Sequence, residues 1–475
     1  MKIWIGLFFS LIVVYLAYIA LSWIAVRLAG VGVMKRAQPD RKSGWVVHLT
    51  FDDGPHPEYT PKLLALLKRY GARATFFVVG EAARAHPDLI RQIAAHGHEI
   101  GLHNVRHVPN WIHPPWRTGR ELRRLADDIE QLAGRRPTLY RPPWGILGLL
   151  DLIFVRGFRV VLWSIMPRDW ERRSDPRTMK WRILHRLAPG EIILLHDSGE
   201  TFGADPKAPG RMLVMLEDLF ETLQEIGLTV RFEPVGEWLV PGSKARANER
   251  TQDASNARAK SKMPLRVRLY FAYEDVHRRV FRYRPLMGRH GFLFYEKKRY
   301  PGPDVEVDGT FVRHGEVGLN LHFNNRLLFR ALTSGAGDLK RIIALKREAE
   351  VALRLLARFV DERMPEVRGV FGYSALHRGI KPFGFAVKPM RPTPYLSLSS
   401  AYMRTLLALL HPEGAGRLKT EGDLEPHWVV MPRAVLLSRY GRKADRRNDE
   451  RHEGRADDRL HRLVRQNGGD REVMR

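Results

Sequence analysis

The sequence predicts an α/β domain in which parallel strands alternate with helices, placed between an N-terminal apolar helix and a second unit of α+β type. Three observations support this organisation. They are an uncharged apolar run near the N-terminus, a regular alternation of β-rich and amphipathic stretches over residues 45–240, and a polar linker at 241–264 before a second core-like region. A chain of 475 residues is too long for one ordinary domain, and its 44% hydrophobic fraction excludes wholesale disorder.

The N-terminal apolar run extends from Ile3 to Val26 without a charged residue, and about 20 such residues can cross a bilayer core. No small-residue cleavage site follows it, so we expect residues 1–26 to form an uncleaved transmembrane anchor rather than a removed signal peptide. A buried core helix is the alternative interpretation. Residues 27–44 are predicted to form a short polar stalk.

Residues 45–240 predict a series of β–α units. Strands are expected at 46–51, 74–79, 99–102, 159–164, 192–195 and 228–232, and helices at 63–70, 87–96, 120–133 and 212–226. Thr118 is expected to cap the third helix, and Gly227 to end the fourth. The alternation favours parallel strands with helical crossovers, in either a barrel or a doubly wound sheet.

Two adjacent carboxylates end the first strand, in the run Thr50-Phe51-Asp52-Asp53-Gly54-Pro55. Neighbours on a strand point to opposite faces, but both can reach one pocket where the strand bends into a turn. Two close carboxylates commonly divide their roles, one staying ionised on a metal while the other acts as a base. The same residues also suit a capped turn, and the motif alone does not choose between these interpretations.

A histidine pair, His103 and His107, follows the strand at 99–102. At i and i+4 the two rings can share one face of a helical turn and hold one metal ion. With Asp53 they offer two imidazoles and one carboxylate, a set that suits zinc or a similar divalent ion and leaves room for water. The spacing alone is weak evidence, because the region is rich in histidine.

Two further polar clusters follow later strands. In Tyr140-Arg141-Pro142-Pro143-Trp144-Gly145 the prolines fix an extended backbone, so Arg141 can be held against a carboxylate and Trp144 can wall a pocket. A rigid surface turn is the alternative. His196 ends an apolar strand and precedes Asp197, and at the same sheet edge as the other clusters it is a candidate acid or base.

In this order and spacing the four clusters resemble the NodB-type polysaccharide deacetylases, carbohydrate esterase family 4, over about residues 45–240. The resemblance implies a distorted (β/α) barrel. It also implies metal-dependent hydrolysis of N-acetyl groups from N-acetylglucosamine-type residues of a cell-surface polysaccharide, with release of acetate. Peptidoglycan, chitin-like oligomers and N-acetylated exopolysaccharides all fit this description.

The resemblance also implies roles for single residues. Asp52 matches the catalytic base, Arg141 its orienting partner and His196 the general acid. The implied metal ligands, for Zn²⁺ or for Co²⁺ or a similar ion, are Asp53, His103 and His107. The implied substrate-contacting residues are Tyr140, Pro143 and Trp144.

Two positions depart from the family pattern. Asn104 replaces a hydroxyl residue, although an amide can still hydrogen-bond the loop. Met166 stands where an aspartate usually supports the acid histidine, so catalysis would be weaker or would rely on Asp169 or Asp197. The alternatives are therefore a catalytically weak or inactive glycan-binding protein tethered to the cell envelope, and an enzyme that hydrolyses a non-sugar amide.

Residues 265–440 regain a core composition and predict an α+β domain, with a helix at 341–360 and strands at 319–323 and 385–387. This region resembles a YkoP-like domain of unassigned function. Basic and aromatic residues alternate between Arg278 and Tyr300, which indicates either a face that binds an anionic lipid or polymer, or a solvated basic face over a β-rich core. Residues 441–475 are densely charged and are expected to be disordered.

The formal charge of +27 is unevenly distributed, with +5 over residues 1–43, +2 over 44–240 and +20 over 241–475. A nearly neutral central region suits an uncharged glycan, and the basic remainder favours attachment near an anionic surface without any specific nucleic acid. The absence of cysteine excludes disulfides, thiolate zinc sites and iron–sulfur clusters. Basic residues after the apolar run favour a cytoplasmic C-terminal part by the positive-inside rule, whereas the implied activity favours an extracytoplasmic catalytic domain on a membrane anchor.

Overall fold

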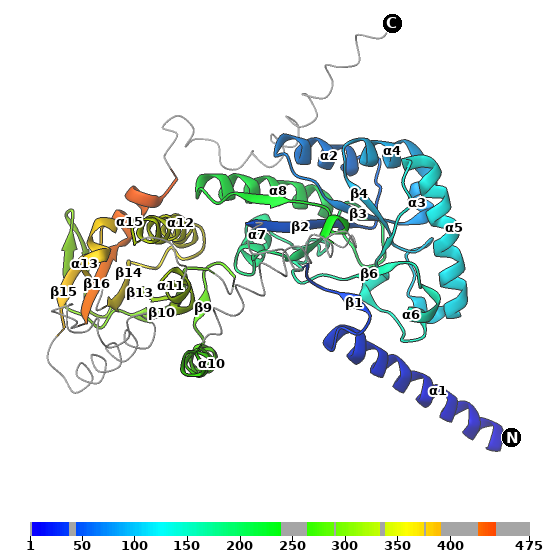
Figure 1. Ribbon diagram of the computed structural model, residues 1–475, viewed down its shortest axis with the longest axis horizontal. Coiled ribbons are helices and arrows are strands. Elements are labelled where there is room, and N and C mark those ends of the chain that lie inside the picture. Colours follow the sequence, from blue (N-terminus) through cyan, green and yellow to red (C-terminus); the bar gives the residue numbers. More distant parts are fainter. Residues whose placement is uncertain are drawn as a thin grey trace, which may run out of the picture.

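The computed structural model describes residues 2–37, 44–238, 264–288, 291–332, 338–374, 377–390 and 426–442. A projecting N-terminal helix, a parallel α/β domain and a second sheet domain follow one another along the chain (Figure 1). The predicted fold class is therefore confirmed. The predicted linker at 241–264 and the predicted tail at 441–475 lie outside the described residues, except for residues 264, 441 and 442.

The first domain is built on a parallel sheet of eight described strands in the order β1-β6-β5-β4-β3-β2-β7, with β8 paired to the start of β2. An isolated parallel bridge between Ile165 and Ile193 joins the segment after β6 to β7, which brings the two ends of the sheet together into the expected distorted barrel. The strands are β1 (Val33–Met34), β2 (Trp45–Asp52), β3 (Thr75–Val78), β4 (Glu99–Leu102), β5 (Leu139–Tyr140), β6 (Arg159–Val161), β7 (Ile192–His196) and β8 (Val230–Phe232).

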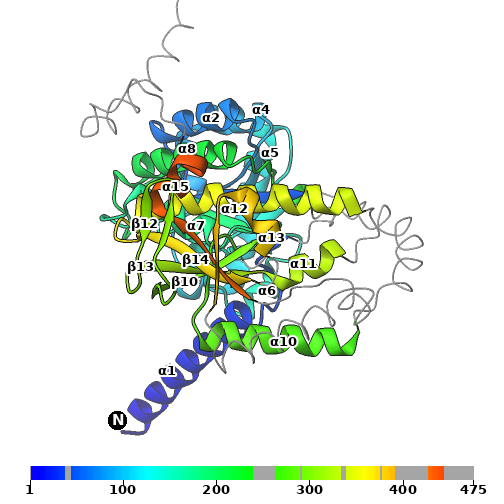
Figure 2. The same cartoon turned by 90° about the vertical axis from the view of Figure 1, so that its left-hand side faces the viewer.

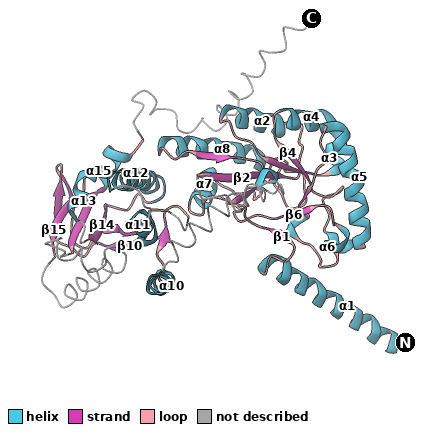
Figure 3. Ribbon diagram, in the orientation of Figure 1, coloured by secondary structure: helices cyan, strands magenta, loops and turns pink. Residues whose placement is uncertain are grey.

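Helices lie between the strands and cover the sheet from outside (Figure 3). They are α2 (Tyr59–Arg69), α3 (Gly80–Ala85), α4 (Pro87–Ala95), α5 (Pro115–Ala133), α6 (Asp151–Phe154), α7 (Pro176–Leu184) and α8 (Ala208–Glu225), with single 3₁₀ turns η3 (Asn110–Ile112), η4 (Pro143–Gly145) and η5 (Gly236–Trp238). Thr118 is buried inside α5 and does not cap it, because Pro115 already occupies the first turn. Gly227, at φ 75°, follows α8 as predicted.

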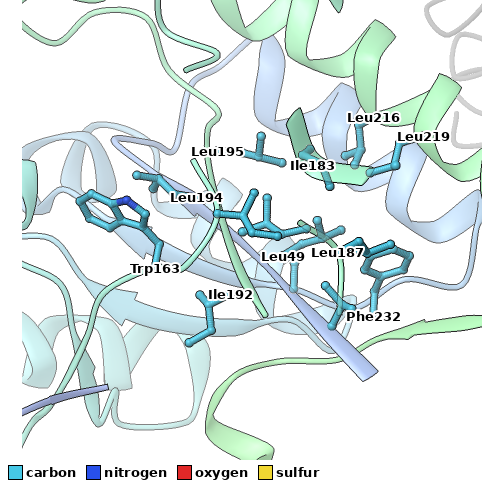
Figure 4. Packing of buried hydrophobic residues seen from close by; sticks show 14 of the residues in the cluster. Leu49, Trp163, Ile183, Leu187, Ile192, Leu194, Leu195, Leu216, Leu219 and Phe232 are labelled. Carbon is cyan, nitrogen blue, oxygen red and sulfur yellow. The ribbon is translucent and has the colours of Figure 1, made fainter. Parts of the chain in front are cut away.

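Apolar side chains between the sheet and helices α7 and α8 form the core of this domain. Leu49, Leu195 and Leu216 are fully or almost fully buried, and Figure 4 shows strand side chains meeting those of the two helices. Each fully buried leucine contributes roughly 1.5–3 kcal/mol. The core fixes the strands, and the strands in turn fix the residues at their carboxyl ends.

The N-terminal helix α1 (Lys2–Trp23) continues through a π-helical turn, η1 (Ile24–Leu28), into β1. Within the described part of the chain, the segment Ser10–Leu28 alone is long and apolar enough to cross a membrane, as an anchor or a signal segment would be. The prediction of a free stalk over residues 27–44 is wrong for residues 27–37. Val33 and Met34 pair with β6, and Arg36 forms an ion pair of 2.9 Å with the buried Glu191.

The second domain has a mixed sheet of six described strands in the order β15-β16-β14-β13-β10-β9, with a separate hairpin of β11 and β12. The strands are β9 (Arg284–Pro285), β10 (Leu293–Arg299), β11 (Val305–Val307), β12 (Thr310–Val312), β13 (Val317–Phe323), β14 (Gly369–Ser374), β15 (Ala386–Pro389) and β16 (His427–Pro432). The helices are α10 (Leu265–Val280), α11 (Asn325–Leu332), α12 (Asp338–Arg363), α13 (His377–Ile380), η6 (Lys381–Phe383) and α15 (Arg433–Tyr440). The predicted strands at 319–323 and 385–387 and the predicted helix at 341–360 correspond to β13, β15 and α12.

A polar cluster inside the contact between the two domains joins α7 and α8 to α12. The ammonium group of Lys180 is fully buried and pairs with Asp218 at 2.8 Å and with Glu362 at 2.9 Å. Trp181 Nε1 also donates to Glu362, at 2.9 Å. The apolar core is continuous across this contact, because residues of β10 and α12 belong to the same buried cluster as those of the barrel. Such a buried, paired charge specifies one docking arrangement of the two domains.

Candidate active site

The candidate site lies at the carboxyl ends of β2, β4, β5 and β7, which meet at one edge of the barrel because the strands are parallel. Asp52 and His196 are register partners on the neighbouring strands β2 and β7. His103 follows β4 directly, and Arg141 follows β5. The four polar clusters that are far apart in the sequence are therefore brought together.

Asp52 is held by a fully buried arginine. Arg141 Nη1 donates to Asp52 Oδ1 at 2.6 Å and to Thr50 Oγ1 at 2.8 Å. Its Nε and Nη2 donate to the backbone oxygens of Val161 and Leu162 at 3.0 and 3.1 Å. A guanidinium with this many fixed acceptors cannot swing away, so it orients one carboxylate oxygen of Asp52 and leaves the other free to face the site.

Asp53, His103 and His107 offer one ligand atom each within 4.8 Å of one another. Oδ1 of Asp53 lies 3.3 Å from Nε2 of both histidines, is buried, and has no hydrogen-bond donor among the described groups. His103 Nδ1 donates to the backbone oxygen of Arg141 at 2.7 Å, which turns Nε2 toward Asp53. These residues fit a divalent metal ion, because two imidazole nitrogens and one otherwise unpaired carboxylate oxygen converge on one point.

The protonation of these groups also suits metal binding, which requires neutral imidazole and ionised carboxylate. Burial lowers the pKa of His107 to about 4. Burial alone would raise the pKa of Asp53, but the close imidazole of His103 and the neighbouring histidine rings hold it far below the usual range. Thr201 Oγ1 donates to the second oxygen, Oδ2, of Asp53 at 2.7 Å and so fixes its orientation.

The two histidines do not share a helical turn, contrary to the prediction. Residues 103–108 form a loop in which Asn104 adopts φ 63°, a left-handed conformation that asparagine tolerates. Asn104 accepts from Tyr140 Oη at 2.9 Å and donates to Asn110 Oδ1 at 2.9 Å. This buried network stabilises the loop and thereby the histidine positions.

Tyr140 and Pro143, which are predicted to contact substrate, are both buried in this structure. The Tyr140 hydroxyl instead stabilises the histidine loop through its hydrogen bond to Asn104. Trp144 differs, since it is 43% exposed and its ring centroid lies 4.3 Å from that of His107. Trp144 can therefore form a wall beside the cluster, as expected.

The partner of His196 is Asp169, one of the two alternatives considered for it. Asp169 Oδ1 accepts from the Nδ1 of His196 at 3.0 Å, and Oδ2 accepts from the backbone N–H of His196 at 2.8 Å. Burial opposes the imidazolium, but the charge and hydrogen bond of Asp169 outweigh it and raise the pKa of His196 to about 10. Met166 packs on the hydrophobic core, and the carboxylate that contacts His196 comes from Asp169, three residues later in the chain.

Asp197 lies behind the site, and its buried surroundings favour the protonated carboxyl. Burial raises the pKa of Asp197 to about 7, although it accepts a hydrogen bond from Thr60 at 2.5 Å. A Cβ on Gly54 would lie 2.3 Å from Oδ1 of Asp197, so only glycine allows the turn after Asp53 to approach this closely. Thr201, Thr60 and Asn110 were not predicted, since single polar residues outside a recognisable motif carry no spacing signal.

Comparison with known proteins gives matches over both domains. The polysaccharide deacetylase family model matches residues 40–148, and the YkoP domain model matches residues 264–440. A peptidoglycan-N-acetylglucosamine deacetylase of Bacillus cereus is 35% identical over 168 residues, which are 32% of this chain and 73% of that protein. A chitooligosaccharide deacetylase of Azorhizobium caulinodans is 37% identical over 158 residues, with 32% and 73% covered. The solved structure of peptidoglycan deacetylase PdaC from Bacillus subtilis matches with 27% identity and a TM-score of 0.38, over 45% of this chain and 99% of that one.

Proposed function

Because this chain belongs to the polysaccharide deacetylase family, carbohydrate esterase family 4, we propose that residues 45–238 hydrolyse N-acetyl groups of N-acetylglucosamine-type residues in a cell-surface glycan. Two relatives bear names that refer to different polymers, peptidoglycan and chitooligosaccharide, and both are called deacetylases. The near-neutral charge of residues 44–240 favours an uncharged sugar chain as substrate.

One observation carries the proposal: three separately supported groups converge on one edge of the barrel. They are the Asp52–Arg141 pair, the cluster of Asp53, His103 and His107, and the His196–Asp169 pair. These supply a base, a metal site and an acid, which are the parts that hydrolysis of an amide requires.

A divalent ion held by Asp53, His103 and His107 would supply a Lewis acid for the acetamide carbonyl and the attacking water. Zinc fits the donor set best, with cobalt as a close substitute. Asp52 accepts the proton of the water as its oxygen attacks the carbonyl carbon, and Arg141 keeps that carboxylate oriented. His196, protonated at neutral pH, then donates a proton to the sugar nitrogen as the C–N bond breaks. The products are acetate and a free amino sugar.

Acetate release from an N-acetylglucosamine oligomer by the zinc-loaded full-length chain tests the proposal. Asp52→Asn should lower kcat by about 10²–10⁴-fold, because it removes the base without changing the shape of the side chain. The matched control is Asp128→Asn, an exposed carboxylate paired with Arg84 on the outer face of α5, which should leave kcat unchanged. Acetate release that survives Asp52→Asn would contradict the assignment of the base. Glycan binding without any acetate release would instead favour a binding protein.

For the whole chain we propose a membrane-anchored arrangement, with α1 as the anchor and the catalytic domain outside the cytoplasm. The domain order is then anchor, deacetylase domain and YkoP domain. Accessibility of the deacetylase domain to added protease in intact cells tests the topology, since protection would place the domain inside.

A further inference from the structure

Helix α10 of the second domain exposes an apolar stripe. Leu265, Leu269, Tyr273, Val276 and Val280 recur every three or four residues and are each 55–68% exposed. The opposite side of α10 is buried through Val267 and Phe271. The helix is thus apolar on the face that it presents to solvent as well as on its buried side, which soluble proteins rarely allow over a length of 16 residues.

Exposed arginines border the stripe. Arg268 and Arg279 lie along one edge of the exposed face and Arg266 along the other, as the 100° turn per residue places them. An apolar strip between basic margins is typical of a helix that lies in the interface of an anionic bilayer, with its apolar side chains among the acyl chains and its arginines at the phosphates.

A second set of exposed apolar residues surrounds the point where α1 meets the barrel, and we call it the collar. Its members are 43–56% exposed, and they are Trp111, Ile112, Trp116, Leu150 and Ile153. The collar contacts α1 directly: Tyr15 Oη donates to the backbone oxygen of Trp111, and Tyr18 Oη accepts from the backbone N–H of Leu150 at 3.0 Å. Tyr15 and Tyr18 both belong to the candidate membrane segment Ser10–Leu28, so the collar lies alongside that segment, and tryptophan is enriched at the water–lipid boundary.

Helix α10, which carries the stripe, and helix α1 lie on the same side of the molecule. Figures 1 and 2, which differ by a quarter turn about the vertical, both place α10 at the lower edge of the folded domains, level with the part of α1 that leaves the barrel. The buried interdomain cluster around Lys180 fixes the second domain on the first, so α10 and α1 can meet one flat surface together.

Short stretches of chain connect the collar to the candidate site. Trp111 follows the candidate ligand His107 by four residues, and Leu150 follows Trp144 by six. The guanidinium of Arg27, in the π-helical turn η1 that continues α1, lies 4.3 Å from the ring of Trp163, and that ring faces the buried Arg141.

We propose that the α10 stripe and the collar lie on the surface of an anionic phospholipid bilayer, and that the candidate active site consequently acts on N-acetylated glycan held at that surface, such as sugar linked to a membrane lipid. The second part of this inference rests on the proposed deacetylase function. The first part rests only on the exposed apolar residues, the flanking arginines and the position of α1.

The natural absence of cysteine allows a direct test on the full-length chain. Val276→Cys, labelled with an environment-sensitive fluorophore and reconstituted in phosphatidylglycerol-containing vesicles, should give blue-shifted emission that shallow spin-labelled lipids quench. Lys68→Cys is the matched control, because it is exposed on α2 at the opposite edge of the molecule and should report water. Equal emission at both positions would overturn the bilayer contact. Equal insertion in vesicles of phosphatidylcholine alone would overturn the role of the arginines.

The substrate part is tested with the double variant Leu269→Glu/Val276→Glu. Its hydrolysis of an N-acetylglucosamine glycolipid in the same vesicles should fall about tenfold or more, since two apolar side chains lose their burial. Its hydrolysis of a soluble oligomer should not change, which also shows that the variant is folded. Unchanged hydrolysis of the glycolipid would refute the preference for membrane-held glycan. If the unmodified chain releases no acetate from either substrate, the deacetylase proposal fails while the labelling result still stands.

Discussion

Replacing Asp169 by asparagine should both slow the reaction and move its pH dependence. Asp169 accepts two hydrogen bonds from His196, one from the ring Nδ1 and one from the backbone N–H. An asparagine has one acceptor oxygen, so one of these two donors loses its partner. The change is nearly isosteric, and it removes the negative charge that keeps His196 protonated.

The size of the effect follows from the contact. A hydrogen bond to a charged group contributes about 1.5–3 kcal/mol, and each pKa unit corresponds to about 1.4 kcal/mol. The pKa of His196, raised to about 10 in the intact site, should therefore fall by roughly one to two units. Since the acid must be protonated to serve the leaving nitrogen, the alkaline limb of the rate profile should move toward neutral pH by the same amount. We expect kcat at pH 7 to fall about 10–100-fold.

The assay is acetate release by the zinc-loaded chain between pH 6 and 10.5, with Asp128→Asn as the exposed control. A uniform loss of kcat at every pH, with the alkaline limb unmoved, would show that Asp169 only shapes the loop and that another group is the acid. An unchanged kcat would remove His196 from the mechanism altogether.

Three other measurements address the fold and the metal site. Burial raises the pKa of Asp197 to about 7, so the folded state keeps a proton that the unfolded chain releases near pH 4. The free energy of unfolding should therefore fall by up to about 4 kcal/mol as the pH rises from about 4 to 7. Asp197→Asn should reduce this dependence on pH, as measured by thermal unfolding. Glu362→Ala leaves the buried Lys180 with one carboxylate partner and should lower the free energy of unfolding by about 3–5 kcal/mol. The control Glu366→Ala, at an exposed ion pair, should lower it by less than about 1 kcal/mol. Equal effects of the two variants on the unfolding midpoint would contradict the role of the interdomain cluster. Chelation should abolish acetate release and zinc should restore it, with a zinc-dependent rise in the unfolding midpoint; activity that persists after dialysis against chelator, with no zinc detected, would contradict metal dependence.

The catalytic edge was largely predictable because each cluster stands directly after a strand, and carboxyl ends of parallel strands converge. Asp52, Asp53, Arg141 and His196 follow from this rule. The local geometry of the loops was not predictable. The histidine loop depends on buried contacts with residues distant in sequence, so the i and i+4 spacing suggested a helical turn that does not exist.

Other differences come from short or tertiary features. The two-residue strand β1 is too short for a periodic signal, and it was taken as part of a stalk. Tyr140 belongs to a motif that looked like a pocket wall, yet its ring points into the core, because exposure depends on packing that the motif alone does not encode. In the basic segment that begins at Arg278, Phe294 and Tyr295 are buried in the core while Phe281 is exposed, so the sequence pattern did not distinguish core aromatic residues from surface ones.

Strand β1 has a mechanical consequence. It pairs with β6 only five residues after the helical segment from α1 through η1 ends, so only a short connection separates this helical segment from the barrel. A long flexible linker would let the enzyme reach glycan at many distances from the membrane. This short connection would instead keep the candidate site at one distance from the membrane. With α1 in a bilayer, encounter with substrate becomes a search in two dimensions, and its rate depends on lateral diffusion of enzyme and glycan rather than on the reach of the chain.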